Sequence, residues 1–261
     1  MTEPRFFYVS SPHPCFAQPS ADMPVWRYMS LPKFVSLLHR RSLHFARADQ
    51  LGDPFEGSWA RYQPDRELMM TFSDHPELEP QRRKVAWQAA RESIAISCWH
   101  AAEHESAGMW SQYGNGGISI RSTFGGLVGT LPKRPDSPSA GIYVGMVKYI
   151  DYATQSVPEG NVYWPFIHKR LSFAHEREVR AIILKPGDQM VDYPALHTRY
   201  RSGGIPESGV EVPIDLSALI ESVYVAPAAP NWFADTVRAI VSKFDLSVTV
   251  VHSSLDDAPF V

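Results

Sequence analysis

The sequence predicts an α+β fold in which helices flank a mixed sheet, with one domain over residues 25–256 after an irregular lead-in over 1–24. Three observations predict it. Short apolar runs typical of strands recur along the chain. Segments with apolar residues at i, i+3 and i+4 separate some of them, and a strand–helix–strand unit closes the chain. The hydrophobic fraction of 44% offsets the ordering entropy of a globular domain, and 261 residues suit one large domain.

Composition excludes several classes of protein. A formal net charge of −3 excludes a uniformly basic nucleic-acid binder. Two cysteines, Cys15 and Cys98, form neither a disulfide framework nor a four-cysteine zinc site. The first residues lack the basic-then-apolar order of a signal peptide, and no apolar run approaches the roughly 18 residues of a membrane helix. We therefore expect a cytoplasmic protein without a membrane segment.

The N-terminal half alternates strand and helix signals. Ser30 can cap a helix whose first turn contains Pro32. Turn residues are dense over 49–57, which predicts a loop; we expect Phe55 to anchor it and Glu56 to face a cleft or bond loop amides. Strands are expected at 25–29, 42–47, 93–100 and 118–121, and further helices at 77–93 and 105–113.

In the C-terminal half, residues 176–184 give the strongest strand signal of the chain. The closing unit has strands at 222–226 and 247–251 around a helix that Asn231 can cap. Two strands joined by a helix are expected to lie parallel. A strand over 145–152, a loop over 153–165 and a short helix over 167–173 complete the prediction.

Two glutamates and an arginine alternate along the predicted strand at 176–184. Glu176, Glu178 and Arg180 would share one face, with the carboxylates about 7 Å apart. One carboxyl pKa should then rise unless Arg180 offsets the repulsion; we expect Arg180 to keep Glu178 ionised and Glu176 to titrate more freely. Such a pair suits general acid–base work or stabilisation of a developing cation. A solvated edge strand with cross-strand salt bridges is the alternative.

Aromatic residues recur at helical spacing over 105–113. Met109, Trp110 and Tyr113 fall on the face that packs against the neighbouring strand. They could form a wall for a flat or cationic ring, or simply pack in the core. Cys98, His100 and His104 do not have the spacing of an established metal motif, so we expect no metal.

Three segments stand out together: residues 45–57, residues 109–114 with 117–120, and Lys169 with Phe173, Glu176, Glu178 and Arg180. They resemble a widespread bacterial family of cytoplasmic proteins, the domain of unknown function 2971. The likeness spans about residues 25–255, and the family label carries no settled activity.

Four features follow one another along the chain: Arg27 on the first predicted strand, Ser97 on a middle strand, Trp110 or Tyr113 in the helix after it, and Glu176 with Glu178 on a late strand. This order resembles the ADP-ribosyltransferase fold, more distantly. In that fold an early strand carries Arg or His, a middle strand ends in Ser or Tyr before a helix with an aromatic, and a late strand carries Glu-x-Glu. Ser97-Cys98-Trp99 stands where that fold has Ser-Thr-Ser, and the closing strand–helix–strand is outside its core.

This resemblance implies cleavage of the nicotinamide–ribose bond of NAD through an oxocarbenium-like transition state. Glu178 would bind the ribose 2′-hydroxyl, and Glu176 would activate the acceptor. The resemblance implies that NAD would be the substrate and that no metal would be needed. Further NAD contacts are implied for Arg27, Tyr28, Ser97, Trp110 and Tyr113. We expect Arg27 and Glu178 to open into one cleft; placement on opposite sides of the sheet would remove the transferase hypothesis outright.

Three hypotheses of function remain open. The first is an ADP-ribosyltransferase-like enzyme, a toxin or phage-defence effector whose acceptor and oligomeric state the sequence does not give. The second is a nuclease or nucleic-acid-binding effector that uses a divalent metal and basic residues on phosphates. The third is a non-enzymatic sensor or partner-binding domain. The basic residues of the second hypothesis are Arg40, Arg41, Arg82, Arg83, Lys84, Arg199 and Arg201.

Overall fold

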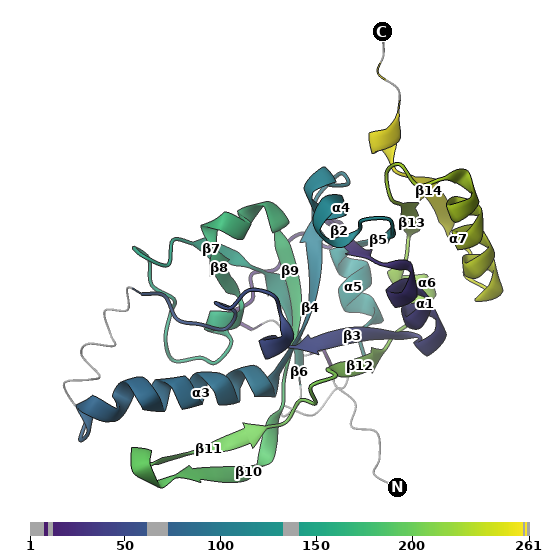
Figure 1. Ribbon diagram of the computed structural model, residues 1–261. Helices are drawn as coiled ribbons and strands as arrows, with labels where there is room; N and C mark the ends of the chain where they lie inside the picture. Colours follow the sequence, from purple (N-terminus) through teal and green to yellow (C-terminus); the bar gives the residue numbers. More distant parts are fainter. Residues whose placement is uncertain (1–7, 10–12, 62–72, 133–140, 258, 260–261) are drawn as a thin grey trace, which may run out of the picture.

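The computed structural model describes residues 8–9, 13–61, 73–132, 141–257 and 259, and it shows a mixed sheet with flanking helices (Figure 1). The sheet has ten strands; β13 with β14 and β1 with β6 are parallel, and the other pairs are antiparallel. The predicted α+β class is therefore confirmed. In order the strands are β1 (Tyr8–Val9), β6 (Gly141–Met146), β9 (Glu178–Leu184), β4 (Ile94–Ala101), β2 (Pro24–Met29), β5 (Ile118–Thr123), β13 (Ser222–Val225) and β14 (Thr249–His252), with β3 (Ser42–Arg47) beside β4 and β12 (Val210–Pro213) beside β3.

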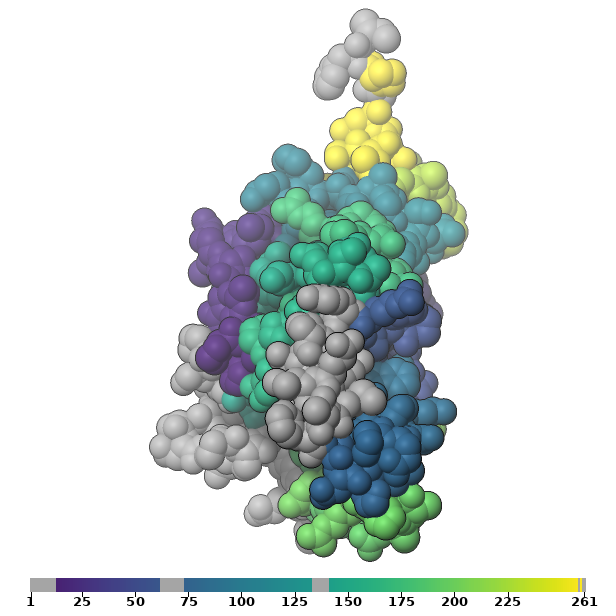
Figure 2. Space-filling view, turned by 90° about the vertical axis from the view of Figure 1, so that its left-hand side faces the viewer, coloured from purple at the N-terminus to yellow at the C-terminus, as the bar shows by residue number. Residues whose placement is uncertain are grey.

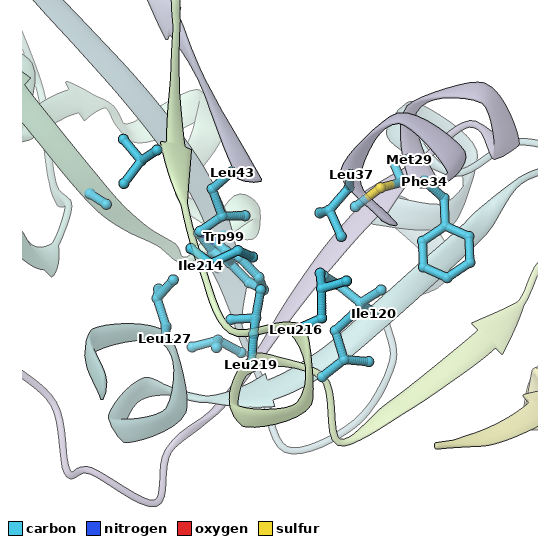
Figure 3. Close-up of a cluster of buried hydrophobic side chains, with 14 of the residues drawn as sticks. Met29, Phe34, Leu37, Leu43, Trp99, Ile120, Leu127, Ile214, Leu216 and Leu219 are labelled. Carbon is cyan, nitrogen blue, oxygen red and sulfur yellow. The ribbon is translucent and has the colours of Figure 1, made fainter. Parts of the chain in front are cut away.

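One face of the sheet carries the main hydrophobic core (Figure 3). Phe34 and Trp99 are fully buried there, and each such side chain contributes roughly 1.5–3 kcal/mol of burial free energy. The same face buries Val179 of β9. Four helices supply the facing side chains: α1 (Leu31–Arg40), α5 (Phe124–Thr130), α6 (Leu216–Leu219) and α7 (Asn231–Lys243).

The opposite face carries the shorter elements. They are α4 (Ala107–Tyr113), the small parallel pair β7 (Lys148–Ile150) and β8 (His168–Arg170), and the 3-10 segments η3 (Trp164–Phe166) and η4 (Leu171–Glu176). Successive side chains of a strand point to opposite faces. Since Trp99 and Val179 enter the main core, their neighbours His100, Glu178 and Arg180 face this second side.

A separate hairpin packs along a long helix at one end of the molecule. The antiparallel pair β10 (Pro186–Tyr193) and β11 (Thr198–Gly203) contacts α3 (Glu79–Ser93), while the C-terminal residues lie at the other end (Figure 2). The sequence did not predict this hairpin. Its strands are largely exposed on both sides, so they lack the apolar alternation that marks a strand bound to a core.

Most predicted elements are confirmed. The strands at 25–29, 42–47, 93–100 and 118–121 appear as β2, β3, β4 and β5, and the closing strands are parallel. Helix α7 begins at Asn231 with Pro230 before it, so the predicted asparagine cap is wrong. Tyr8 and Val9 form β1 inside the segment expected to be irregular. The predicted boundaries of the domain remain predictions.

Two C-terminal expectations are wrong in detail. The strand over 145–152 is split at Val147, because β6 stays in the main sheet while β7 pairs with β8. The helix over 167–173 begins as strand β8 and turns into the 3-10 segment η4. None of the described helices has both the length and the apolar run that a membrane crossing requires.

Candidate functional site

A cavity of about 460 Å³ lies on the second face of the sheet, over the ends of β2, β4 and β9. Helix α4 and segment η4 form one side of it, and the loop over 51–56 forms another. Its size suits a small organic ligand, since such sites typically measure about 300–1,000 Å³. Apolar and aromatic side chains line most of it, with a group of charged side chains among them.

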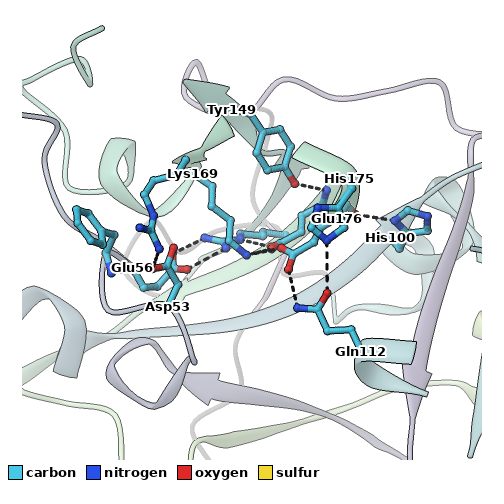
Figure 4. Close-up of polar contacts among 12 residues, drawn as sticks. Asp53, Glu56, His100, Gln112, Tyr149, Lys169, His175 and Glu176 are labelled. Atoms are coloured by element: carbon cyan, nitrogen blue, oxygen red, sulfur yellow. Dashed lines mark hydrogen bonds and ion pairs between the residues drawn. The ribbon is translucent and has the colours of Figure 1, made fainter. Parts of the chain in front are cut away.

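The charged side chains form one continuous buried network (Figure 4). Lys169 Nζ donates to the Glu176 carboxylate and, at 2.7 Å, to Glu178 Oε1. Arg180 Nε donates to Glu178 Oε2 at 2.5 Å, and its two terminal nitrogens donate to Glu56 at 2.5 and 3.0 Å. Carboxylates and cations therefore alternate along the network.

The two catalytic candidates have opposite pKa shifts. Burial alone would raise the pKa of Glu178, but the charges of Arg180 and Lys169 outweigh it and hold that pKa well below its usual range. Burial raises the pKa of Glu176, and the neighbouring Glu178 carboxylate adds to the increase. These directions agree with the expectation that Glu178 stays ionised and Glu176 titrates more freely.

Glu176 and Glu178 are brought together by a different backbone structure from the single strand that was predicted. Strand β9 begins at Glu178, whereas Glu176 ends the 3-10 segment η4, so the two do not share a strand face. Arg177 between them has a left-handed backbone with φ of 40°. This turn redirects the chain, and Lys169 then bridges both carboxylates.

Aromatic side chains also line the cavity, and one of them contacts a carboxylate directly. Tyr113 of α4 is 46% exposed, and its hydroxyl donates to Glu176 Oε1 at 2.7 Å. The Tyr28 hydroxyl accepts from the Ser106 backbone N–H at 2.8 Å. Trp110 was expected here, but it is buried behind Tyr28 with its ring centroid 5.0 Å away. Its indole N–H donates to Glu105, so the expectation that Trp110 stacks on a ligand is wrong.

Ser97 and Arg27 lie on the opposite face of the sheet from Glu178. Ser97 pairs with Ala181 and is buried away from the cavity, so its predicted ligand role is wrong. Arg27 borders the cavity, but its guanidinium lies over Trp99 and donates to a backbone carbonyl of β3. Neighbouring residues of a strand cannot both face the same side, and on β2 the register gives that place to Tyr28.

The loop over 51–57 is held by ion pairs. Asp53 accepts from Arg170 at 2.7 Å, and Glu56 accepts from Arg180. Phe55 was expected to be a buried anchor; it is 43% exposed, with the Arg170 guanidinium 4.1 Å from its ring centroid. Phe55 is therefore held at the surface by the Arg170 guanidinium and by the Tyr152 ring, whose centroid lies 6.2 Å away.

Gly57→Ala is expected to destabilise the protein by about 1–3 kcal/mol, because it combines overpacking with an unfavourable backbone. Gly57 has φ of +69°, and an added Cβ would lie 2.3 Å from the Phe166 ring. Gly52→Ala in the same loop is the control, since nothing lies within 4 Å of its added Cβ. Urea unfolding measures both, and equal midpoints would contradict the prediction.

Several side chains of the cavity were not predicted from the pattern of residues in the sequence. Lys169 stands on β8, a separate short strand, and no periodicity links it to Glu178. Its only signal was its place in the family resemblance. Gln112 and His100 also line the cavity. Within the part of the chain that the structure describes, no three His, Cys, Asp or Glu side chains are placed to hold a metal ion.

Comparisons with known proteins add one partial likeness. No family model matches the chain, and no curated protein matches it. A solved structure of DarT from Thermus sp. 2.9 in complex with NAD+ matches with a TM-score of 0.40 and 8% identity, over 93% of this chain and 100% of that chain. At this TM-score and identity the match establishes no family for the chain. The resemblances to both families therefore remain predictions.

Proposed function

We propose that this protein binds NAD in the cavity and cleaves its nicotinamide–ribose bond, passing ADP-ribose to an acceptor or to water. One observation carries the proposal: a single lysine bridges two buried carboxylates of unequal pKa, Glu176 and Glu178, at an aromatic-lined cavity. Three carboxylates face two cations in the network, so the fully ionised state has one negative charge in excess.

The excess negative charge of the network suits cleavage of the nicotinamide–ribose bond. The nicotinamide ring of NAD is planar and cationic, and bond cleavage moves positive charge onto the ribose. An excess of negative charge in a poorly solvated cavity stabilises both species. Aromatic faces such as those of Tyr28 and Tyr113 suit a cationic ring. The cations already bound to Glu178 do not use up its acceptor capacity, because a carboxylate has about four lone-pair sites.

Each residue then has a defined role. Glu178, ionised, accepts a hydrogen bond from the ribose 2′-hydroxyl and stabilises the developing cation. Glu176, with the higher pKa, takes the proton of the attacking hydroxyl or water. Tyr28 and Tyr113 border the nicotinamide. The guanidinium of Arg27 lies on the other face of the sheet from Glu178, which by the criterion given above removes a transferase site in which Arg27 holds NAD. The assignment therefore gives Arg27 no part and depends on the two carboxylates, the lysine that bridges them and the aromatic cavity. A toxin or phage-defence effector would direct the transfer at a macromolecule.

Calorimetry with NAD and a nicotinamide-release assay test the proposal. We expect saturable binding and release of nicotinamide without added metal. Wild-type protein that neither binds nor cleaves NAD would contradict the proposed function. Metal-dependent loss of nucleic acid in the same preparation would instead support the nuclease hypothesis.

Glu176→Gln is expected to reduce labelling of an acceptor by about a hundredfold, as for loss of a general base, and to reduce nicotinamide release less. Labelled NAD with a total cell lysate measures transfer, and nicotinamide release is followed separately. Since the base must be deprotonated, wild-type transfer should rise as the pH rises through the raised pKa of Glu176, and the variant should lack that increase. Glu221→Gln, whose carboxylate pairs with Arg121 at the surface, is the control. Equal loss of transfer and release in Glu176→Gln would contradict the assignment.

A further inference from the structure

His100 is a buried histidine that borders the cavity and has no role in the scheme above. It stands opposite Glu178 in the β4–β9 register, and both side chains face the cavity side of the sheet. Directly opposed side chains in an antiparallel pair have Cβ atoms about 4.5–5.5 Å apart. His100 therefore lies beside the carboxylate that is proposed to contact the ribose.

The tautomer of His100 is set by one backbone contact. Its Nδ1 lies 2.6 Å from the Glu176 carbonyl oxygen (Figure 4). A carbonyl oxygen only accepts, so Nδ1 carries the proton. Burial lowers the pKa of His100, and the nearby charge of Arg177 lowers it further. The ring is therefore neutral near pH 7, and Nε2 presents an unprotonated lone pair.

This lone pair is available to a ligand. Among the described residues no side chain or backbone group bonds Nε2, and Nε2 is not one of the enclosed polar atoms that lack a partner. Tyr28, whose ring centroid is 6.2 Å away, and the cavity lie on the same side of the sheet. A fixed acceptor in such a place favours a ligand that brings a hydrogen-bond donor.

We propose that His100 Nε2 accepts a hydrogen bond from the ribose hydroxyl next to the one that Glu178 accepts. The inference rests on the proposed function and makes it more specific. Two acceptors on neighbouring strands match the two adjacent hydroxyls of a ribose, so the pair selects a cis-diol. The 2′-hydroxyl donates to Glu178 and the 3′-hydroxyl donates to His100.

His100→Asn tests the acceptor without removing the backbone contact. The asparagine amide can still donate to the Glu176 carbonyl, but it offers nothing at the position of Nε2. We expect an unchanged melting temperature and NAD affinity about three- to tenfold weaker, the usual effect of losing one neutral hydrogen bond. Calorimetry measures the affinity and thermal unfolding measures the fold.

His168→Asn is the matched control. Its Nδ1 likewise lies 2.7 Å from a backbone carbonyl, that of Trp164, and burial likewise lowers its pKa, but it does not line the cavity. We expect wild-type NAD affinity in this variant. A matching loss of affinity in both variants would show that the effect of His100→Asn is structural, and would overturn the proposal.

The pH dependence of NAD affinity shows whether His100 acts as a hydrogen-bond acceptor or only as a structural residue. Protonated Nε2 cannot accept, so wild-type affinity should fall as the pH falls through the lowered pKa of His100, below about 6.5. His100→Asn should lack this decrease. The other ionisable groups near the ring are His175, Arg177, Glu176, Glu178 and Tyr28. His175→Asn is therefore included, and it should retain the decrease.

An NAD analogue without the 3′-hydroxyl of the nicotinamide ribose tests the same contact from the ligand side, and needs no variant. Wild type should bind it about three- to tenfold more weakly than NAD, and His100→Asn should bind both equally. Wild type that binds NAD but shows neither this preference nor the pH dependence would overturn the role of His100 and leave the proposed function standing. Wild type that binds no NAD at any pH would overturn the proposed function itself.

Discussion

Glu178→Gln is expected to reduce nicotinamide release by about a hundred- to a thousandfold, the effect of removing one electrostatic stabiliser of a charged transition state. Glutamine keeps the shape of the side chain and removes its charge. In wild type the low pKa of Glu178 keeps it ionised throughout the neutral range. The variant can still contact a ribose hydroxyl, but it cannot stabilise positive charge on the ribose.

The variant should remain folded, and this separates an effect on chemistry from an effect on stability. Without the Glu178 charge, two ion pairs remain, Lys169 with Glu176 and Arg180 with Glu56, and the charges of the network balance. Because the ionised Glu178 also contributes stability near neutral pH, we expect a lowered melting temperature, but a variant that is folded at assay temperature and continues to bind NAD. Glu221→Gln again serves as the control for losing a carboxylate far from the cavity. A folded Glu178→Gln protein as active as wild type would exclude Glu178 from the reaction.

Arg180→Met is expected to destabilise the protein by about 3–5 kcal/mol, the usual result of removing one partner from a buried ion pair. Arg180 is 1% exposed and donates to Glu56, Glu178 and the Phe166 carbonyl oxygen. Methionine fills part of the space but donates to none of them. Two buried carboxylates then lose a cation, and the loop over 51–57 loses the contact that fixes Glu56.

Urea unfolding at several pH values measures this loss. In wild type the lowered pKa of Glu178 contributes stability that is present near neutral pH and is lost as the pH falls towards that pKa. Without Arg180, the buried carboxyls can take up protons more easily. The difference between wild type and variant should therefore shrink as the pH falls from 7 to about 4.

Arg121→Met is the control for this variant, because Arg121 pairs with Glu221 at the surface. Exposed pairs contribute about 0–1 kcal/mol, so its unfolding midpoint should stay near that of wild type. A similar small effect for Arg180→Met would mean that the network contributes little to folding.

Local patterns of residues were enough to predict the elements whose signal is local. Strands such as β4 and β13 consist mostly of apolar residues, and α1 carries an apolar stripe with Phe34 and Leu37 at helical spacing. Burial of such residues against any core requires the same local backbone, so the pattern and the structure agree. The proximity of Glu176 and Glu178, and their opposite pKa shifts, were expected for the same reason: the two residues are close in the chain.

The tertiary structure decided which side chains meet. Strand alternation already required Arg27 and Tyr28 to face opposite sides, but only the pairing of β2 with its neighbours placed Tyr28 on the side of Glu178. Lys169 reached the carboxylates from another strand, across the turn at Arg177. Contacts of this kind depend on register and on distant segments, and they leave no periodic trace in the sequence. The free acceptor on His100 arises in the same way, from a backbone carbonyl that only the folded chain brings to its Nδ1.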